Sequence, residues 1–595
     1  AYLYKYYSTY SPKLYLFDLI GAATGCVLGQ MIISYVQFNS VPLLLSCLAG
    51  ILAFAITIRC SEARYSKYIA VLIILLSIFA AQLNYQTGFL EIKRAPNMAV
   101  LDYRMQDDVR EHWYRWNSYS RLSLISHRKR GSDQTKYLFT IDNGRGNVHL
   151  RTWSPDGPVT ADLLEGFSPV GLAFLANAPQ DILIMFAGAG IDMLQAYYLS
   201  DGKADITGVE LNPLIVNSAP KLPRFRLGEF FALDNVHMHI REGRDFLNAT
   251  EKKYDAIIYS WGGASFSNYL GTSGYTGRFL FTKEAMTSVI DHLTPDGVIG
   301  IVNSNKIRVI ATMKTAFEES GRRDFGDHVV ILERSTVGQP SVYHHSIFST
   351  LDNHVVLYKN SPFTEEDLDR IDRNASDINL TVLYSPRYVR PEFQAYKDTL
   401  LAKDTHRYLQ DLSRKYLIDL SVSVDDRPFI ENMFYPQMIF TKDFWTNIDS
   451  FSRRDSTKQH TLNIYTFWFI VFLVLLAFLL ILLPLLLTQR LSALKADLPY
   501  LYYFSTLGVG FILIEIALMN QFVLFLGNPI FAFSLILAVL LLSTGIGSYI
   551  SKGLFEKGIV NIGRMALVCA GLLLVYFFLL PVVLRSLLGV TQWLK

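Results

Sequence analysis

The stretch Asp181-Ile-Leu-Ile-Met-Phe-Ala-Gly-Ala-Gly-Ile-Asp192 decides the fold of the soluble part of this chain. It begins as a short apolar run typical of a buried strand and continues into a turn that contains Gly188 and Gly190. Glycines let the backbone approach a ligand closely, and the first amide groups of the following helix are free to bind one. In doubly wound α/β folds the ligand lies at this first strand-to-helix turn.

Apolar strands and amphipathic helices alternate around this turn, which predicts an α/β doubly wound, Rossmann-like domain over residues 161–335. The second predicted strand ends in Glu210, 22 residues after Gly188, where a carboxylate can accept both hydroxyls of a ribose. The glycines and Glu210 together favour a nucleoside-binding ancestry over plain turn chemistry. The predicted strands and helices are Asp181–Phe186, Asp192–Leu199, Asp205–Glu210, Val236–Arg241, Asp255–Ser260, Thr282–His292 and Val298–Asn303.

Two further soluble parts flank this domain. Residues 88–160 are predicted to form a linker and a small N-terminal antiparallel β subdomain, because alternating segments such as Tyr137–Asp142 precede a turn signal at Asn143-Gly144. Residues 336–460 are predicted to form an accessory C-terminal part of the soluble region.

Hydrophobic helices bracket the soluble region. The chain has 595 residues, of which 51% are hydrophobic and 18% charged, and charged residues are scarce before residue 88 and after residue 461. A spanning helix needs about 20 apolar residues, which predicts about three transmembrane helices in 1–87 and about four in 461–595. The second segment is short, so a re-entrant hairpin with the first is an alternative. The predicted segments are Leu14–Tyr35, Val41–Ile58, Ile69–Gln86, Leu462–Leu487, Leu498–Phe525, Ile530–Ile550 and Met565–Leu588.

Two features of these segments invite a specific interpretation. Gly21, Gly25 and Gly29 recur every four residues, which predicts a helix-packing face rather than a ligand groove. Glu515 lies in the middle of a predicted span, where an ionised carboxylate is costly. We expect a structural hydrogen bond to another helix there, and a proton or ion relay is the alternative.

Loop charge predicts the orientation in the membrane. With seven spans, the Lys and Arg residues of the short loops gather on one side, and the loops 36–40 and 527–529 on the other side have none. The positive-inside rule places the basic loops in the cytoplasm, so the soluble domain is expected to be extracytoplasmic, most simply at a bacterial cytoplasmic (inner) membrane. The chain begins at Ala1 without a methionine, and we expect further residues upstream. The basic residues are Lys5, Lys13, Arg59, Arg64, Lys67, Arg490, Lys495, Lys552, Lys557 and Arg564.

Several classes of partner are not expected. The net charge is +3, and lysine and arginine are interspersed with acids, so the sequence predicts no nucleic-acid partner. All four cysteines lie in or beside hydrophobic segments. His344, His345 and His354 lack the spacing of zinc ligands, so no metal site is expected. The lipid bilayer and other membrane proteins are the expected partners.

Four motifs of the soluble region and one helical run stand out together. The motifs are Trp116-Asn-Ser-Tyr-Ser-Arg121, Gly208-Val-Glu-Leu-Asn-Pro213, Glu242-Gly-Arg-Asp-Phe-Leu247 and Asp425-Asp-Arg-Pro-Phe429, and the run is 508–548 with Leu526-Gly-Asn-Pro529. They resemble the membrane-fused spermidine-synthase-like proteins, and the likeness covers nearly the whole chain. Spermidine synthases move an aminopropyl group from decarboxylated S-adenosylmethionine to putrescine. The resemblance implies an S-adenosylmethionine-type site formed by Gly188, Gly190, Asp192 and Glu210, with Glu242 near the adenine.

The groups that aminopropyl transfer requires are missing. The attacking amine must lose a proton, and the family has acidic residues for this after the fourth strand. Here Ser260 and Gly263 stand in the acidic places, so no catalytic residue is assigned. Phe186 replaces the first glycine of the nucleotide turn, and its ring would crowd the ligand. We also interpret Asp425-Asp426-Arg427-Pro428 as a structural turn in which Arg427 pairs locally.

Two hypotheses follow. The first is a pseudoenzyme, a non-catalytic structural or accessory subunit of a membrane protein assembly, for which no cofactor is expected. The second is a transferase that uses S-adenosylmethionine or its decarboxylated form to move an aminopropyl or methyl group to an amine or a membrane-associated acceptor. A transporter with Glu515 as a proton relay is a third reading.

Overall fold

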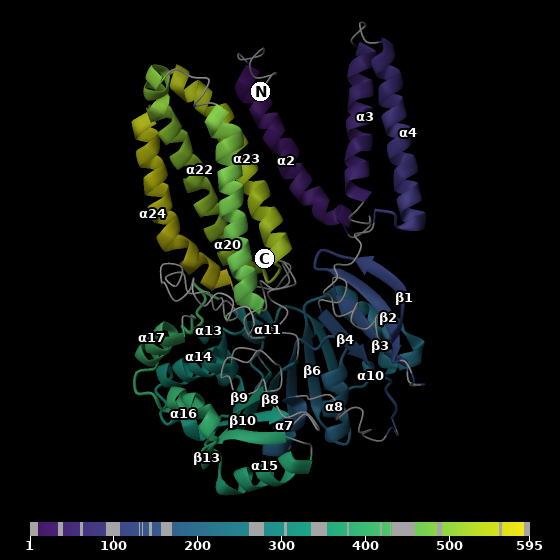
Figure 1. Cartoon of the computed structure of the whole chain (residues 1–595), viewed down its shortest axis with the longest axis vertical. Helices are drawn as coiled ribbons and strands as arrows, with labels where there is room; N and C mark the ends of the chain where they lie inside the picture. The colour runs from purple at the N-terminus through teal and green to yellow at the C-terminus, as the bar shows by residue number, and fades with distance from the viewer. Residues whose placement is uncertain are drawn as a thin grey trace. The chain divides into compact units, whose positions relative to one another are not determined.

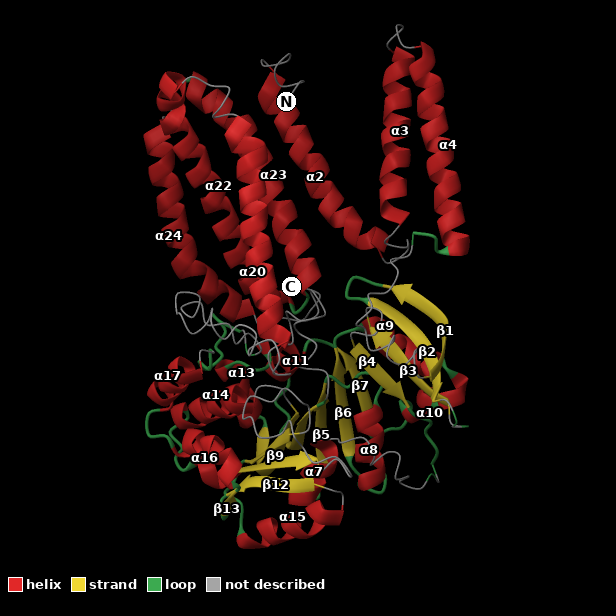
Figure 2. Cartoon of the chain, viewed as in Figure 1, coloured by secondary structure: helices red, strands yellow, loops and turns green. Residues whose placement is uncertain are grey.

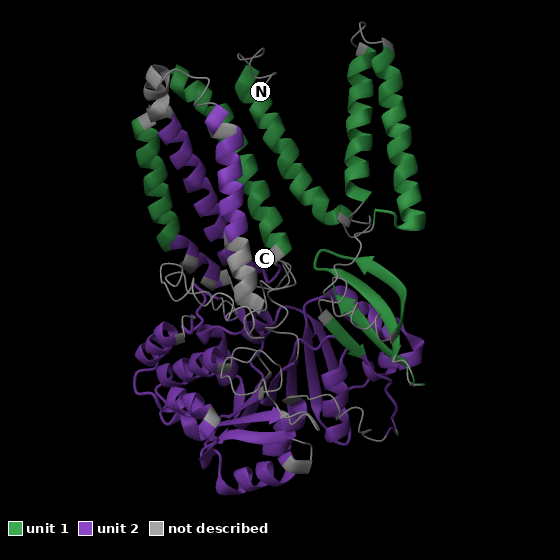
Figure 3. Ribbon diagram, in the orientation of Figure 1, with its two compact units in different colours: residues 1–149, 530–578 green, residues 150–529, 579–595 purple. Residues whose placement is uncertain are grey.

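The computed structural model divides into two compact units (Figures 1 and 3). Unit 1 comprises Ala1–His149 and Ile530–Phe578, and unit 2 comprises Leu150–Pro529 and Leu579–Lys595. The structure describes residues 10–33, 40–59, 64–90, 107–129, 131, 133, 135–141, 146–155, 157, 169–260, 279–302, 306–334, 354–377, 380–416, 419–428, 430, 458–484, 491–558 and 562–587.

A mixed sheet of nine strands forms the centre of unit 2 (Figure 2). Its strand order is β13-β12-β10-β11-β9-β8-β5-β6-β7. The pairs among β5 to β9 are parallel, and β10 to β13 extend the sheet by antiparallel pairs. The strands are β5 (Asp181–Met185), β6 (Asp205–Glu210), β7 (Val236–Ile240), β8 (Tyr254–Tyr259), β9 (Leu293–Val302), β10 (Val329–Arg334), β11 (His354–Lys359), β12 (Leu380–Ser385) and β13 (Tyr388–Val389).

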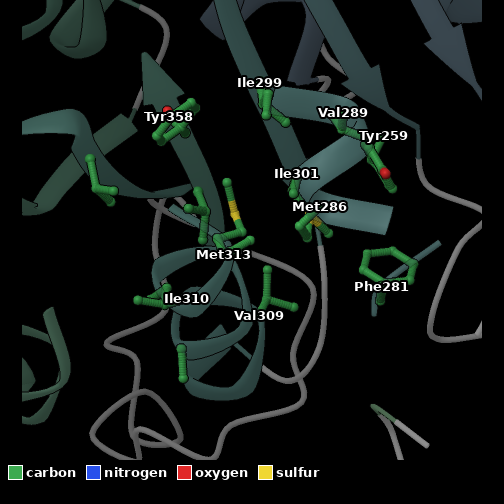
Figure 4. Close-up of a cluster of buried hydrophobic side chains, with 14 of the residues drawn as sticks. Tyr259, Phe281, Met286, Val289, Ile299, Ile301, Val309, Ile310, Met313 and Tyr358 are labelled. Carbon is green, nitrogen blue, oxygen red and sulfur yellow. The ribbon is translucent and has the colours of Figure 1, made fainter. Parts of the chain in front are cut away.

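Helices form two rows on this sheet, as expected for a doubly wound fold. In one row α15 contacts α7 and α7 contacts α8; in the other α16, α14, α13 and α11 contact one another in that order. Figure 4 shows part of the core beside the second row, with Met286 and Val289 of α13 near Ile299 and Ile301 of β9. The helices of unit 2 outside the apolar segments are α7 (Pro169–Ala176), α8 (Ile191–Leu199), α9 (Pro213–Ser218), α10 (Leu227–Phe230), α11 (Gly243–Ala249), α13 (Lys283–Asp291), α14 (Lys306–Glu319), α15 (Glu365–Asp377), α16 (Gln394–Leu401) and α17 (Thr405–Tyr416).

The predicted Rossmann-like strands and helices are all present, and the largest difference is in β9, which begins at Leu293, five residues before its predicted start. β5 ends one residue early because Phe186 has φ 57°, which leaves the extended region. α13 matches its prediction, since the Thr282 side chain accepts from the Ala285 amide and caps the helix. Three strands, β11 to β13, come from the predicted accessory part 336–460, which therefore adds to the same sheet.

Unit 1 contains a separate sheet of four strands in the order β1-β2-β3-β4, where a small antiparallel subdomain was predicted. Its first hairpin turns at Asn117, whose side chain accepts from the amides of Tyr119 and Ser120. Arg121 is buried, pairs with Glu111 at 2.9 Å and lies over the Tyr114 ring at 3.9 Å. The predicted turn at 143–144 lies outside the described residues. The strands are β1 (Asp107–Trp116), β2 (Arg121–Lys129), β3 (Thr135–Ile141) and β4 (Gly146–Leu150).

Helices occupy all seven predicted spans, and six of those described are long and apolar enough to cross a membrane. The seventh, α20, has a shorter described apolar part, Trp468–Leu480, and passes into a π-helical turn at Phe478–Leu482. The helices are α2 (Ser11–Ile33), α3 (Val41–Arg59), α4 (Arg64–Thr87), α20 (Lys458–Ala477), α22 (Leu491–Leu526), α23 (Pro529–Glu556) and α24 (Ile562–Leu587).

The glycine face of α2 has no neighbour among the described residues. A Cβ atom built at Gly21, Gly25 or Gly29 would meet nothing within 4 Å in the described part of the chain. The packing face therefore stays a prediction. α2 meets α23 through the Gln30 amide, which donates to Ser534 Oγ at 2.8 Å, because a paired amide is favourable between apolar helices.

The second apolar helix pairs with the third and not with the first. Ser77 donates to Ser46 Oγ at 3.0 Å, and Asn84 donates to Ser40 Oγ at 2.8 Å. A Cβ atom at Gly50 would lie 3.4 Å from the Ala70 carbonyl, so this glycine allows α3 and α4 to approach closely. The re-entrant hairpin of the first two segments is therefore replaced by an α3–α4 hairpin.

Candidate functional site

The turn after β5 is built from left-handed backbone. Phe186, Gly188 and Gly190 have φ of 57°, 56° and 88°, and the Gly190 amide donates to the Ala187 carbonyl at 2.8 Å. A left-handed conformation is cheap for glycine but costs about 1–2 kcal/mol for a residue with a Cβ atom. Two of these positions therefore carry the residue that the backbone requires, and Phe186 carries one that is strained.

Gly190 is also required by packing inside the domain. A Cβ atom there would lie 2.8 Å from Cζ of Phe231, so the ring of Phe231 occupies the space beside this glycine. Asp192 follows in the first turn of α8 and is buried. The assignment of Gly190 and Asp192 to a cofactor stays a prediction.

Glu210 joins the ends of the first two strands. Its Oε2 accepts from the Gly188 amide at 3.0 Å and its Oε1 accepts from the Asn212 amide at 2.8 Å. Burial raises the pKa of Glu210, against the lowering effect of these backbone hydrogen bonds. Each carboxylate oxygen has a second lone pair, so Glu210 can still accept a hydroxyl of a ligand.

Glu242 follows β7 and holds the start of α11. Its Oε2 accepts from the Asp245 amide at 2.9 Å, whereas its Oε1 is buried and has no hydrogen-bond partner in the described part of the chain. Burial raises the pKa of Glu242 to about 7, although the Asp245 amide and Arg244 lower it. A buried oxygen without a partner is costly, and a donor on a ligand would remove that cost.

Three aromatic rings lie at the carboxyl ends of β5 and β8. The Phe186 ring is stacked on Phe281 at 6.5 Å between centroids and meets the edge of Tyr259 at 6.1 Å. Figure 4 shows Tyr259 and Phe281 among the buried side chains of the core. The ring of Phe186 thus packs toward β8, whereas Glu210 ends β6, the neighbour of β5 on its other side.

The segment after β8 begins with Ser260, which is buried, and its amide donates to the Met185 carbonyl at 3.2 Å. Gly263 lies outside the described residues. Tyr259 donates to the Leu280 carbonyl at 3.2 Å, and burial raises the pKa of its phenol far above the ordinary value. A phenol held in this way stays protonated at neutral pH and cannot serve as a base.

Sequence reasoning missed the role of Asp425. Its Oδ1 accepts from Arg244 Nη1 at 2.5 Å and from Thr282 Oγ1 at 2.8 Å, which connects α11, α13 and the segment 419–428. Arg427 pairs with Asp419 at 2.7 Å, which confirms the predicted local pairing. The two motifs were visible in the sequence, but nothing in them shows that residues 181 positions apart form a pair.

No protein-family model and no curated protein matches the chain. Solved structures do resemble it, at low identity. A spermidine synthase in complex with the transition-state analogue AdoDATO is 14% identical, with 51% of this chain and 87% of that chain covered and a TM-score of 0.29. The Thermotoga maritima spermidine synthase is 16% identical, with 49% and 88% covered and a TM-score of 0.31. Human methyltransferase-like protein 13 in complex with SAH is 20% identical, with 37% and 90% covered and a TM-score of 0.26.

The structural neighbours are thus spermidine synthases and S-adenosylmethionine methyltransferases. At these identities and TM-scores, the similarity assigns neither a cofactor nor a reaction to this chain. None of these three neighbours is described as a membrane-fused protein, and membership of the membrane-fused family stays a hypothesis.

Proposed function

We propose that this is a multi-pass membrane protein whose spermidine-synthase-like domain does not catalyse transfer and serves as a structural or accessory subunit of a membrane assembly. The supporting observation lies at the ends of β5 and β8, where Phe186, Tyr259 and Phe281 pack together. The sequence between Asp255 and Glu284 contains no Asp, Glu or His. An amine that enters there would find apolar rings, and this segment itself offers no carboxylate or imidazole to take its proton.

The helices support the membrane part of this proposal. The six long apolar helices expose large hydrophobic side chains along most of their length, as expected for contact with lipid or with other apolar helices. We place the soluble domain outside the cytoplasm of a bacterial cell, on the basis of the basic loops. A cysteine placed at exposed Lys203, with the native cysteines changed to serine, should react with a membrane-impermeant thiol reagent in intact cells. Labelling only after lysis would reverse the orientation.

A turnover assay tests the non-catalytic role. The full chain in nanodiscs is incubated with decarboxylated S-adenosylmethionine and putrescine, and separately with S-adenosylmethionine and cell membranes, and methylthioadenosine and S-adenosylhomocysteine are quantified by mass spectrometry. We expect less than one product molecule per chain. Multiple turnovers that disappear in Glu210→Ala would establish a transferase.

Genetic complementation tests the accessory role. Removal of the chain should lower the amount of a stoichiometric membrane partner identified by cross-linking in intact cells. A Glu210→Gln chain that folds should restore that partner fully, because the role needs the surface and not the reaction. Failure of Glu210→Gln to restore the partner, with normal folding, would contradict this role.

The second candidate is a transferase dependent on S-adenosylmethionine, and the unpaired Oε1 of Glu242 favours it. That oxygen and Glu210 fit the donors of an adenosyl group, namely an amine and two hydroxyls. When bound, such a group would supply an electrophilic carbon next to its sulfonium. Calorimetry with S-adenosylmethionine, its decarboxylated form and methylthioadenosine tests the site. Micromolar binding that Glu210→Ala abolishes would show that the site is intact, and turnover would then decide between the candidates.

A further inference from the structure

The carboxyl end of a membrane helix lies against Glu242. α22 ends at Leu526, and the next residue, Gly527, has φ 65° and donates its amide to the Val523 carbonyl at 3.0 Å. This is the geometry of a helix that terminates in a left-handed glycine. A Cβ atom built at Gly527 would lie 3.0 Å from Cβ of Glu242 and 3.7 Å from its Cγ. Both residues belong to unit 2.

The last turn of α22 is packed against protein. Val523 and Phe525 are 5% and 8% exposed, and in the middle of the helix Glu515 is 9% exposed whereas Leu513 is 62% exposed. The end of α22 is therefore buried where Gly527 meets Glu242.

Glu242 cannot retreat from this contact without moving α11. A Cβ atom at Gly243 would lie 3.0 Å from Leu280 Cδ1 and from Met185 Sδ, so the first residue of α11 is wedged against the core. Arg244 is held by Asp425 at 2.5 Å. These contacts hold the start of α11 in place, so a shift of the Glu242 backbone would also move α11.

We propose that Gly527 and the end of α22 form one wall of the site to which Glu242 belongs, so that a ligand bound to Glu242 Oε1 is sensed by a membrane helix. The ligand class is a planar heterocycle with an N–H donor, such as the base of an adenosyl compound. The inference rests on the proposed non-catalytic role and adds to it. Ligand binding at Glu242 would change the position of a membrane helix without any reaction. Glu242 provides the hydrogen-bond acceptor, and Gly527 leaves space beside it because it has no side chain.

A pair of glycine variants tests the inference. Gly527→Ala adds a methyl group that meets Glu242, whereas Gly558→Ala adds one at the same φ of 65° with nothing within 4 Å. The backbone strain is matched, so only contact with Glu242 differs. The affinities of the full chain in nanodiscs for S-adenosylmethionine and methylthioadenosine are measured by calorimetry. We expect Gly527→Ala to bind at least about tenfold more weakly than wild type and Gly558→Ala to be unchanged.

A disulfide tests the contact without a ligand. Glu242→Cys with Gly527→Cys, in a chain whose four native cysteines are serine, should form a disulfide under mild oxidation. The two Cβ atoms would lie 3.0 Å apart, and a shift of about 0.5 Å brings them to the usual disulfide spacing of about 3.5–4.5 Å. Gly527→Ala binding as tightly as wild type, or absence of the disulfide, would overturn the inference. The inference would also be overturned if the double-cysteine variant formed the disulfide but the wild-type chain bound neither S-adenosylmethionine nor methylthioadenosine. The proposed non-catalytic role would stand in that case. Product formation in the turnover assay would rule out the non-catalytic role. The comparison of Gly527→Ala with Gly558→Ala would still test whether α22 affects ligand binding at Glu242.

Discussion

The backbone amide of Gly188 donates to Glu210 Oε2 at 3.0 Å, so the glycine turn after the first parallel strand is bonded to the end of the second. The other oxygen of Glu210 accepts from the Asn212 amide at 2.8 Å, at the start of α9. One side chain therefore connects the turn after β5 with the start of α9, and its removal should lower the stability of the domain.

Glu210→Ala should destabilise the chain by about 1–3 kcal/mol, because two backbone amides lose their acceptor. Thermal unfolding of the full chain in detergent measures the effect. Glu229→Ala is the control, since Glu229 is exposed and pairs only with exposed Arg226 in the described structure. That change should stay within about 0.5 kcal/mol of wild type. Equal stability of Glu210→Ala and wild type would show that the two hydrogen bonds to Glu210 do not stabilise the fold.

At Phe186 a glycine variant should be more stable than an alanine variant, the reverse of the usual order of stability. Both Phe186→Ala and Phe186→Gly lose the contacts with Tyr259 and Phe281, but only glycine relieves the strain of φ 57°. Phe186→Gly should therefore be the more stable variant by about 1 kcal/mol in chemical unfolding. Ala187→Gly, one residue on, should be destabilising by about 0.5–1 kcal/mol. The left-handed assignment is wrong if Phe186→Ala proves the more stable of the two.

Glu242 should make stability depend on pH between about 4.5 and 7. Burial raises the pKa of Glu242 from 4.5 to about 7 in the folded chain, so the folded state holds a proton that the unfolded state has released. The stabilisation by this proton is fully present below pH 4.5 and is lost as the pH rises toward 7. Between pH 5 and pH 8, the free energy of unfolding of wild type should fall by about 2 kcal/mol more than that of Glu242→Gln. Parallel pH profiles would refute the assignment.

Arg244 and Asp425 should be energetically coupled. Their side chains are 14% and 23% exposed and lie 2.5 Å apart. A double-mutant cycle with Arg244→Met and Asp425→Asn should give a coupling of about 1–3 kcal/mol in unfolding. The pair Lys203 and Asp201, 72% and 82% exposed, should give a coupling near zero. Similar coupling energies in the two cycles would show that Asp425 does not stabilise the connection between α11, α13 and the segment 419–428.

The sequence predicted the elements of the soluble domain because strand and helix periods are local. Residues from Asp181 to Val302 contain each parallel strand within a few residues of its expected bounds. Glu210 was placed at a strand end by the same reasoning, and the structure adds that it bonds the glycine turn.

The relations between distant segments could not be predicted. The ring of Phe186 was expected to crowd the ligand, and its actual direction toward β8 depends on Phe281, 95 residues later. The contact of Gly527 with Glu242 joins the two ends of a long stretch of chain, and no spacing rule reports it. The partner of the glycine face of α2 could not be predicted either, because spacing shows which residues share a face, not what covers that face.

The contact between Gly527 and Glu242 also couples the movements of two segments. α22 ends at Leu526, and the next residue, Gly527, touches the side chain that begins α11. The two segments belong to the same unit, so a displacement of α22 along its axis should carry Glu242 and the start of α11 with it. A force on the apolar helix would then reach the buried carboxyl group without passing through any of the loops between them.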